Sequence, residues 1–130
     1  MTINGLQLTS QFYGVVNNDW TFPSNALDME NNIFYATTGG TYAGGSVGMG
    51  GSIGVVTHNL FYNGSDGDGW DSHPVSGDPL FVSTTTPDFH LQSGSPAIGA
   101  GSTAVVSVVT TDYDVTARSS TSIDIGAYTH

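Results

Sequence analysis

The sequence predicts an all-β fold in which short strands coil into a single-stranded β-helix, with few or no helices. The chain has 130 residues, 18 of them glycine, and only one lysine or arginine. Ser, Thr, Asn and Val are abundant, and this composition favours short strands and tight turns over helices. In addition, a short apolar motif recurs every 20 to 27 residues, which is the length of one turn of a solenoid.

The repeated motif aligns NGLQL (4–8), NNIFY (31–35), HNLFY (58–62) and DPLFV (78–82). The same aliphatic position of the motif is held by Leu6, Ile33, Leu60 and Leu80. Since the rungs of a solenoid bury inward side chains on one another, we expect these four to stack inside. By alternation along each strand, a second set also points inward, namely Leu8, Tyr35, Tyr62 and Val82. The residues between these two sets point outward, namely Gln7, Phe34, Phe61 and Phe81. Three outward phenylalanines need a covering segment or form an apolar patch. A slip of one residue would instead put the aromatic rings inside.

Two asparagines precede successive strands at the same place in the repeat, Asn32 and Asn59. Asparagine tolerates corner conformations, and its amide can donate to the next rung. We therefore predict a structural asparagine ladder at this corner.

The chain has room for one modest domain. We expect a single β-helix domain over 1–130, with rungs near 4–30, 31–57, 58–77 and 78–101 and closing strands in 102–130. The glycine-rich run at 39–54 has the composition of a linker, but its place inside a repeat indicates a loop or tight corner.

Two segments carry a family resemblance: GDPLFVSTTTPDFHLQSGSPAIGAG (77–101) and DIGAYTH (124–130). They resemble the carboxy-terminal end of right-handed parallel β-helix proteins of the pectate-lyase-like superfamily, and among these the choice-of-anchor domains of secreted bacterial proteins. Gly99 and Thr129 depart from that pattern, which carries aspartate and glutamate there. The resemblance implies the fold and an extracellular location. It leaves function open, since this solenoid hosts lyases, hydrolases and plain binding modules.

The formal net charge of −10 disfavours nucleic acid, anionic lipid and polyuronate chains as partners. No apolar run is long enough for a membrane span, and residues 1–20 lack the features of a signal peptide. We expect an exported protein to be represented here by a mature or excised piece. The chain has no cysteine, which excludes disulfides and thiolate chemistry.

Catalytic signatures are weak. There is no lysine, and Arg118 lies in DVTARSS, which looks like a closing hairpin. The carboxylate pairs available for acid and base chemistry are Asp66 with Asp68 or Asp71, and Asp112 with Asp114. His58 and His90 are expected to be structural or surface residues. The sequence therefore predicts no catalytic residues, with a polysaccharide lyase or glycoside hydrolase as the alternative.

A charge-poor solenoid with aromatic side chains in polar loops favours carbohydrate binding, because rings stack on sugar C–H faces and polar groups bind hydroxyls. The chain is similar in architecture and size to β-helical modules that accompany xylan-degrading enzymes. We expect a monomeric, extracellular, non-catalytic module for a neutral plant polysaccharide, most of all xylan, tethered to a catalytic domain. The predicted ligand-binding residues are Trp20, Trp70, Tyr13, Tyr42, Asp19 and Asn18. The competing interpretation is a structural cap that closes the end of a longer surface protein.

The stretch DGDGWDSH (66–73) also predicts a calcium site. Calcium takes six to eight oxygen ligands from such glycine-punctuated acidic loops. The predicted ligands are Asp66, Asp68, Asp71 and Asp78. An ordinary solvated acidic turn is the alternative, since the distal glutamate of EF-hand-like loops is missing.

Overall fold

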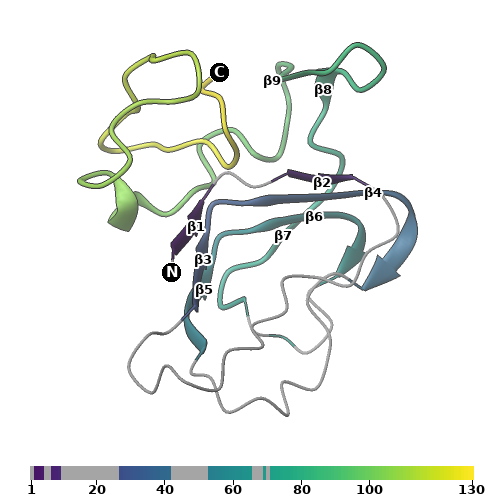
Figure 1. The fold of residues 1–130 in the computed structure, drawn as a ribbon, viewed down its shortest axis with the longest axis horizontal. Coiled ribbons are helices and arrows are strands. Elements are labelled where there is room, and N and C mark those ends of the chain that lie inside the picture. Colours follow the sequence, from purple (N-terminus) through teal and green to yellow (C-terminus); the bar gives the residue numbers. More distant parts are fainter. Residues whose placement is uncertain (1, 5–6, 10–26, 42–52, 66–68, 70) are drawn as a thin grey trace.

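The computed structural model describes residues 2–4, 7–9, 27–41, 53–65, 69 and 71–130 (Figure 1). Over these residues the regular structure consists of strands and a single 3-10 turn at Thr103–Val105. The prediction of an all-β fold is therefore confirmed. No helix within these ranges is long and apolar enough to cross a membrane.

Two parallel sheets share the first part of the chain. One sheet has the order β1-β3-β5, with β1 at Thr2–Asn4, β3 at Leu27–Glu30 and β5 at Ile53–Thr57. The other has the order β2-β4-β6-β7, with β2 at Gln7–Thr9, β4 at Ile33–Thr41, β6 at Leu60–Ser65 and β7 at Val75–Ser76. From β1 to β6 the chain alternates between the sheets, which meet at an angle (Figure 1). Each alternation adds one strand to the growing edge of the sheet that it enters.

The register between β4 and β6 follows the sequence repeat. Ile33 pairs with Leu60, Phe34 with Phe61 and Tyr35 with Tyr62, so the predicted 27-residue alignment is confirmed here. The register between β2 and β4 is shifted by one residue, because Gln7 rather than Leu6 pairs with Ile33. The equivalence predicted for Leu6 and Ile33 is therefore wrong.

Both faces of this second sheet are buried where β4 and β6 begin. Ile33 and Leu60 pack in a core with residues from the C-terminal half of the chain: Phe81, Leu91, Ala97 and Ile125. On the opposite face Phe34 and Phe61 are only 2% and 3% exposed, and their rings stack with centroids 5.1 Å apart. Two of the three phenylalanines predicted to face outward are thus enclosed. Stacking of identical residues in register lets each ring cover its neighbour.

The fourth repeat, at 78–82, does not continue the sheet. Leu60 pairs with Val75 instead of aligning with Leu80, and Leu80 has a φ of 51° and is 36% exposed while Phe81 is buried. The inward position predicted for Leu80 and the outward one predicted for Phe81 are both wrong. The local cause is a turn in which the Leu80 N–H donates to Asp78 Oδ1 at 2.9 Å, and the rigid Pro79 within it redirects the chain.

After this turn the chain forms an antiparallel hairpin of β8 (Phe81–Ser83) and β9 (Asp88–Leu91). Val82, which the repeat places inside, is half exposed in β8. The hairpin and the C-terminal segment, residues 102–130, lie on the same side of the β2-β4-β6-β7 sheet (green to yellow in Figure 1). Together they cover the face that carries Ile33 and Leu60, which explains why that face is apolar.

The predicted asparagine ladder is confirmed and has a third member. Asn59 Oδ1 accepts from the backbone N–H and the side-chain amide of Asn32, both at 2.9 Å. Asn59 in turn donates from its backbone N–H (2.8 Å) and its side-chain amide (2.7 Å) to Asp71 Oδ2. All three side chains are buried. A carboxylate suits the end of the ladder because it accepts hydrogen bonds on both oxygens.

Hydrogen bonds hold the C-terminal segment against the corner between the two sheets. Asn31, which has a φ of 58°, donates from its side chain to Ser102 O and accepts from the Ser102 N–H at 2.7 Å. The Gly126 N–H donates to Asn31 O at 3.0 Å. These bonds satisfy buried groups at a strained corner, so they fix how the closing segment lies on the sheet.

Candidate functional site

Most of the site residues predicted from sequence lie outside the described residues: Trp20, Trp70, Tyr13, Tyr42, Asp19, Asn18, Asp66 and Asp68. Of the predicted metal ligands the structure describes Asp71 and Asp78.

Both carboxylate oxygens of Asp71 accept hydrogen bonds from nearby residues. Its Oδ2 accepts two hydrogen bonds from Asn59, and its Oδ1 accepts from the His73 N–H at 2.8 Å. Asp78 Oδ1 accepts from the Leu80 N–H. Within the described residues, no group of three His, Cys, Asp or Glu side chains is arranged to hold a metal ion. Calcium stays a prediction, and it rests mainly on Asp66 and Asp68.

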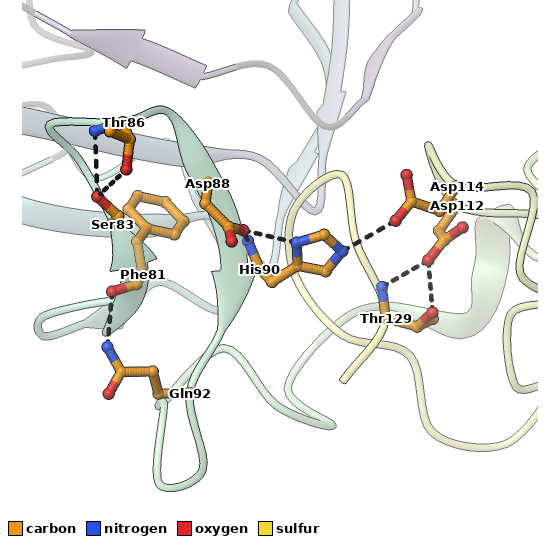
Figure 2. Close-up of polar contacts among 9 residues, drawn as sticks. All are labelled: Phe81, Ser83, Thr86, Asp88, His90, Gln92, Asp112, Asp114 and Thr129. Carbon is orange, nitrogen blue, oxygen red and sulfur yellow. Dashed lines mark hydrogen bonds and ion pairs between the residues drawn. The ribbon is translucent and has the colours of Figure 1, made fainter.

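The structure assembles a different polar cluster from two separate segments, shown in Figure 2. His90, on β9, lies between two carboxylates. Its Nδ1 is 2.7 Å from Asp88 Oδ1, also on β9, and its Nε2 is 2.9 Å from Asp114 Oδ2 in the C-terminal segment. We call Asp88, His90 and Asp114 the His90 bridge. All three side chains are 43% to 52% exposed, so the bridge lies at the surface.

Two tyrosines adjoin the His90 bridge. The ring centroid of Tyr128 is 4.1 Å from that of His90, and Tyr113 meets Tyr128 edge to face at 5.6 Å. Tyr113 is 76% exposed. We call Tyr113 and Tyr128 the tyrosine platform. An exposed aromatic ring can stack on an apolar ligand face, and the polar groups beside it can hydrogen-bond to hydroxyls.

The charges of the bridge stabilise one another. Hydrogen bonds to Asp88 and then Asp114 raise the pKa of His90 above its ordinary value of 6.5. The side-chain hydrogen bond from His90 lowers the pKa of Asp88 below 3.8. Burial, followed by the charge of Asp114, raises the pKa of Tyr128. Near neutral pH the bridge therefore holds ionised Asp88 and retains its proton on His90 more strongly than a free imidazole does.

The carboxylates of Asp112 and Asp114 do not form an acid and base pair. Asp112 Oδ2 accepts from the Thr129 N–H and hydroxyl, and Asp112 Oδ1 accepts from the Thr116 N–H. Desolvation acts to raise the pKa of Asp112, but these hydrogen bonds outweigh it and lower the pKa to about 2. A carboxyl that stays ionised to such acidity is a poor general acid. It serves instead to hold Thr129.

Because the folded-state pKa of Asp112 lies below its ordinary value, the contribution of Asp112 to stability is present above about pH 4 and is lost as the pH falls toward 2. We expect Asp112→Asn to lower the free energy of unfolding by about 1 kcal/mol at neutral pH and to flatten its decline in acid. Urea unfolding at a series of pH values measures both effects. An equally steep acid decline in the variant would contradict this role.

The Arg118 side chain donates hydrogen bonds to three backbone carbonyl oxygens. Its guanidinium donates to Asp124 O at 3.3 Å and Gly126 O at 2.8 Å, and its Nε donates to Thr111 O at 3.4 Å. Burial lowers the pKa of Arg118, against the charges of Asp112 and Asp124. These contacts support the interpretation of Arg118 as part of the closing hairpin.

A second polar cluster lies at the sheet corner. The rings of His58 and His73 stack with centroids 4.8 Å apart, and Thr57 Oγ1 lies 2.7 Å and 3.2 Å from their Nδ1 atoms. The Ser72 hydroxyl donates to Thr57 Oγ1 and lies 3.1 Å from His73 Nδ1. Among the described residues, no carboxylate is within hydrogen-bond distance of these two imidazole rings.

Sequence reasoning missed the tyrosine platform. It considered Asp112 with Asp114 as a pair but not Tyr113 between them in TDYD (111–114). An aromatic residue flanked by two aspartates is a local sign of an exposed ring. The contact with His90 and Tyr128 arises only from the tertiary fold.

No protein-family model, curated protein or solved structure matches the chain.

Proposed function

We propose that this chain is a right-handed parallel β-helix that acts outside the cell as a non-catalytic binding module for a neutral plant polysaccharide, most of all xylan. The parallel pairing of β1-β3-β5 and β2-β4-β6 at successive turns supports the architecture. The observation that carries the binding function is the tyrosine platform beside the His90 bridge. In the full-length protein the module would act as a monomer tethered to a catalytic domain.

The platform supplies the two kinds of contact that a sugar needs. The exposed ring of Tyr113 offers an apolar face, and the carboxylates of Asp88 and Asp114 offer hydrogen-bond acceptors for hydroxyls. Sugars at such sites are held by stacking together with polar contacts.

The charge of the chain selects among polysaccharides. The net charge is −10, and two of the platform's neighbours are carboxylates. Like charges across an interface weaken association. A neutral or sparsely charged chain therefore fits better than a polyuronate.

A purely structural role is the second candidate, and a specific observation favours it. The closing segment covers the apolar sheet face and is hydrogen-bonded to the corner through Asn31, Ser102 and Gly126. A cap needs this covering and does not need an exposed tyrosine. Loss of glycan binding on changing Tyr113 therefore separates the two functions.

We expect Tyr113→Ala to weaken binding to soluble xylan by about tenfold, since stacking contributes roughly 0.5 to 1.5 kcal/mol beyond the apolar area that it buries. Affinity electrophoresis in gels with and without xylan measures the change. Tyr113→Phe keeps the ring and is expected to retain binding. Val108→Ala changes another strongly exposed apolar residue and serves as the matched control.

The same gels test the predicted loop aromatics through Trp20→Ala and Trp70→Ala. If the unmodified protein migrates identically with and without xylan or a β-glucan, the binding function is wrong and the cap is favoured. Release of reducing or unsaturated products from xylan would overturn the non-catalytic assignment.

A further inference from the structure

The His90 bridge imposes a protonation state through its geometry. A carboxylate accepts hydrogen bonds but cannot donate them, and a neutral imidazole has one N–H group and one lone pair. Both ring nitrogens of His90 lie within 2.9 Å of carboxylate oxygens, Asp88 Oδ1 on one side and Asp114 Oδ2 on the other. With both carboxylates ionised, only the imidazolium can donate to both. In the neutral form one nitrogen would present its lone pair to a carboxylate oxygen, and that contact would become repulsive.

The bridge joins two parts of the chain that are 24 residues apart in sequence. Asp88 and His90 belong to β9, whereas Asp114 belongs to the C-terminal segment that also carries Tyr113. Figure 2 shows His90 reaching from the hairpin toward this segment. Since Tyr113 directly precedes Asp114, the contact between His90 and Asp114 fixes the backbone that presents the exposed ring.

The second tyrosine belongs to the same unit. Tyr128 lies against His90 and also against Tyr113. A cation beside an aromatic ring is attracted by its π-electrons, so the contact of Tyr128 with His90 is stronger when the imidazole is protonated. Loss of the proton therefore weakens the Asp114 contact and the Tyr128 contact together.

We propose that His90 is a positioning residue whose protonation latches Asp114 and the tyrosine platform in place, so that polysaccharide binding strengthens as the pH falls through the titration of His90. This inference rests on the proposed function, because it concerns regulation of the same platform. The latch itself is a property of the fold and can be measured without a ligand.

The groups that face His90 determine the sign of the effect. They are Asp88 on its own strand and, from the C-terminal segment, Asp114 and Tyr128; Asp112 and Tyr113 act on Tyr128. The charged neighbours are all acids, so they favour the imidazolium. The folded-state pKa of His90 is raised, which means that the latch is fully formed below its ordinary value of 6.5 and is released as the pH rises through the folded-state value.

The latch is tested first by NMR of the protein labelled on histidine. The resonances of His90 are identified by their loss in His90→Gln. We expect both ring nitrogens of His90 to stay protonated at a pH where a free imidazole is neutral, and the resonances of Tyr113 and Tyr128 to move with the same midpoint. Titration of His90 at or below its ordinary pKa, or tyrosine resonances that do not follow it, would overturn the latch.

The consequence for binding is tested with xylohexaose at about pH 5.5 and about pH 8.5, on either side of the histidine range. We expect the affinity of the unmodified protein to fall by about threefold or more at the higher pH. His90→Gln and Asp114→Asn should each bind with nearly the same affinity at both pH values. His130→Gln alters another exposed histidine and should keep the pH dependence.

Each combination of results is informative. A latch seen by NMR with equal xylohexaose affinity at both pH values refutes the regulation. A pH-dependent affinity for xylohexaose that persists in His90→Gln also refutes the regulation. If xylohexaose and soluble xylan bind at neither pH, the proposed function fails, and the NMR titration alone then decides whether the latch exists.

Discussion

Asn59→Ala is expected to lower the free energy of unfolding by about 3 kcal/mol or more, because Asn59 is the central member of a buried ladder. Its side chain makes four hydrogen bonds, two accepted from Asn32 and one donated to each of Met29 O and Asp71 Oδ2. Removing it leaves buried partners unsatisfied, at a cost of roughly 1 to 3 kcal/mol for each group. For a domain whose total stability is about 5 to 15 kcal/mol, this is a large fraction. The midpoint of urea unfolding measures the loss.

Two further variants sharpen the test. Asn59→Asp keeps the shape but replaces the amide donor with a second carboxylate oxygen facing Asp71, where the amide now donates at 2.7 Å. We expect it to be at least as destabilising as the alanine variant at neutral pH, and to recover in part when acid protonates one of the carboxyls. Ser93→Ala, at an exposed position, should change stability by less than about 0.5 kcal/mol. A loss below about 1 kcal/mol in Asn59→Ala would contradict the role of the ladder.

The ladder also shows where sequence reasoning succeeds. Residues in equivalent positions of a stacked repeat contact one another directly, so the spacing of 27 residues between Asn32 and Asn59 predicted their hydrogen bonds. Asp71 follows Asn59 by only 12 residues, and no repeat marks it. Its acidic surroundings indicated a calcium loop, whereas in the structure its carboxylate meets two donors of Asn59. The competition between these roles depends on three-dimensional neighbours that local sequence does not contain.

The candidate site was less predictable than the fold for the same reason. The His90 bridge and the tyrosine platform combine residues from 88 to 128, and none of their spacings is a motif. What the sequence does carry is the flanking of Tyr113 by aspartates and the placement of His90 two residues after Asp88 on one strand. Side chains two apart on a strand share a face, so the first contact of the bridge, but not the second, could be predicted.

The repeat motif misled the assignment of faces at 78–82, and the pair Leu60→Ala and Leu80→Ala measures the consequence. The repeat treats the two leucines as equivalent. In the structure Leu60 is 0% exposed in the core that joins the sheet to the closing segment, while Leu80 is 36% exposed. We expect Leu60→Ala to lower the free energy of unfolding by about 3 to 5 kcal/mol, through lost burial and the cavity that remains.

Leu80→Ala is expected to cost less than about 1 kcal/mol, since it removes a partly exposed side chain and leaves no enclosed cavity. The Leu80 backbone already has a φ of 51°, which alanine adopts at a similar cost to leucine, whereas Leu80→Gly should relieve that strain and offset part of the loss. Urea unfolding of the three variants gives the ranking. Equal losses for Leu60→Ala and Leu80→Ala would restore the equivalence that the repeat implies and would mean that 78–82 stacks as a fourth rung. A large difference would show that the sheet is closed by the hairpin and the C-terminal segment, on whose packing the position of the tyrosine platform depends.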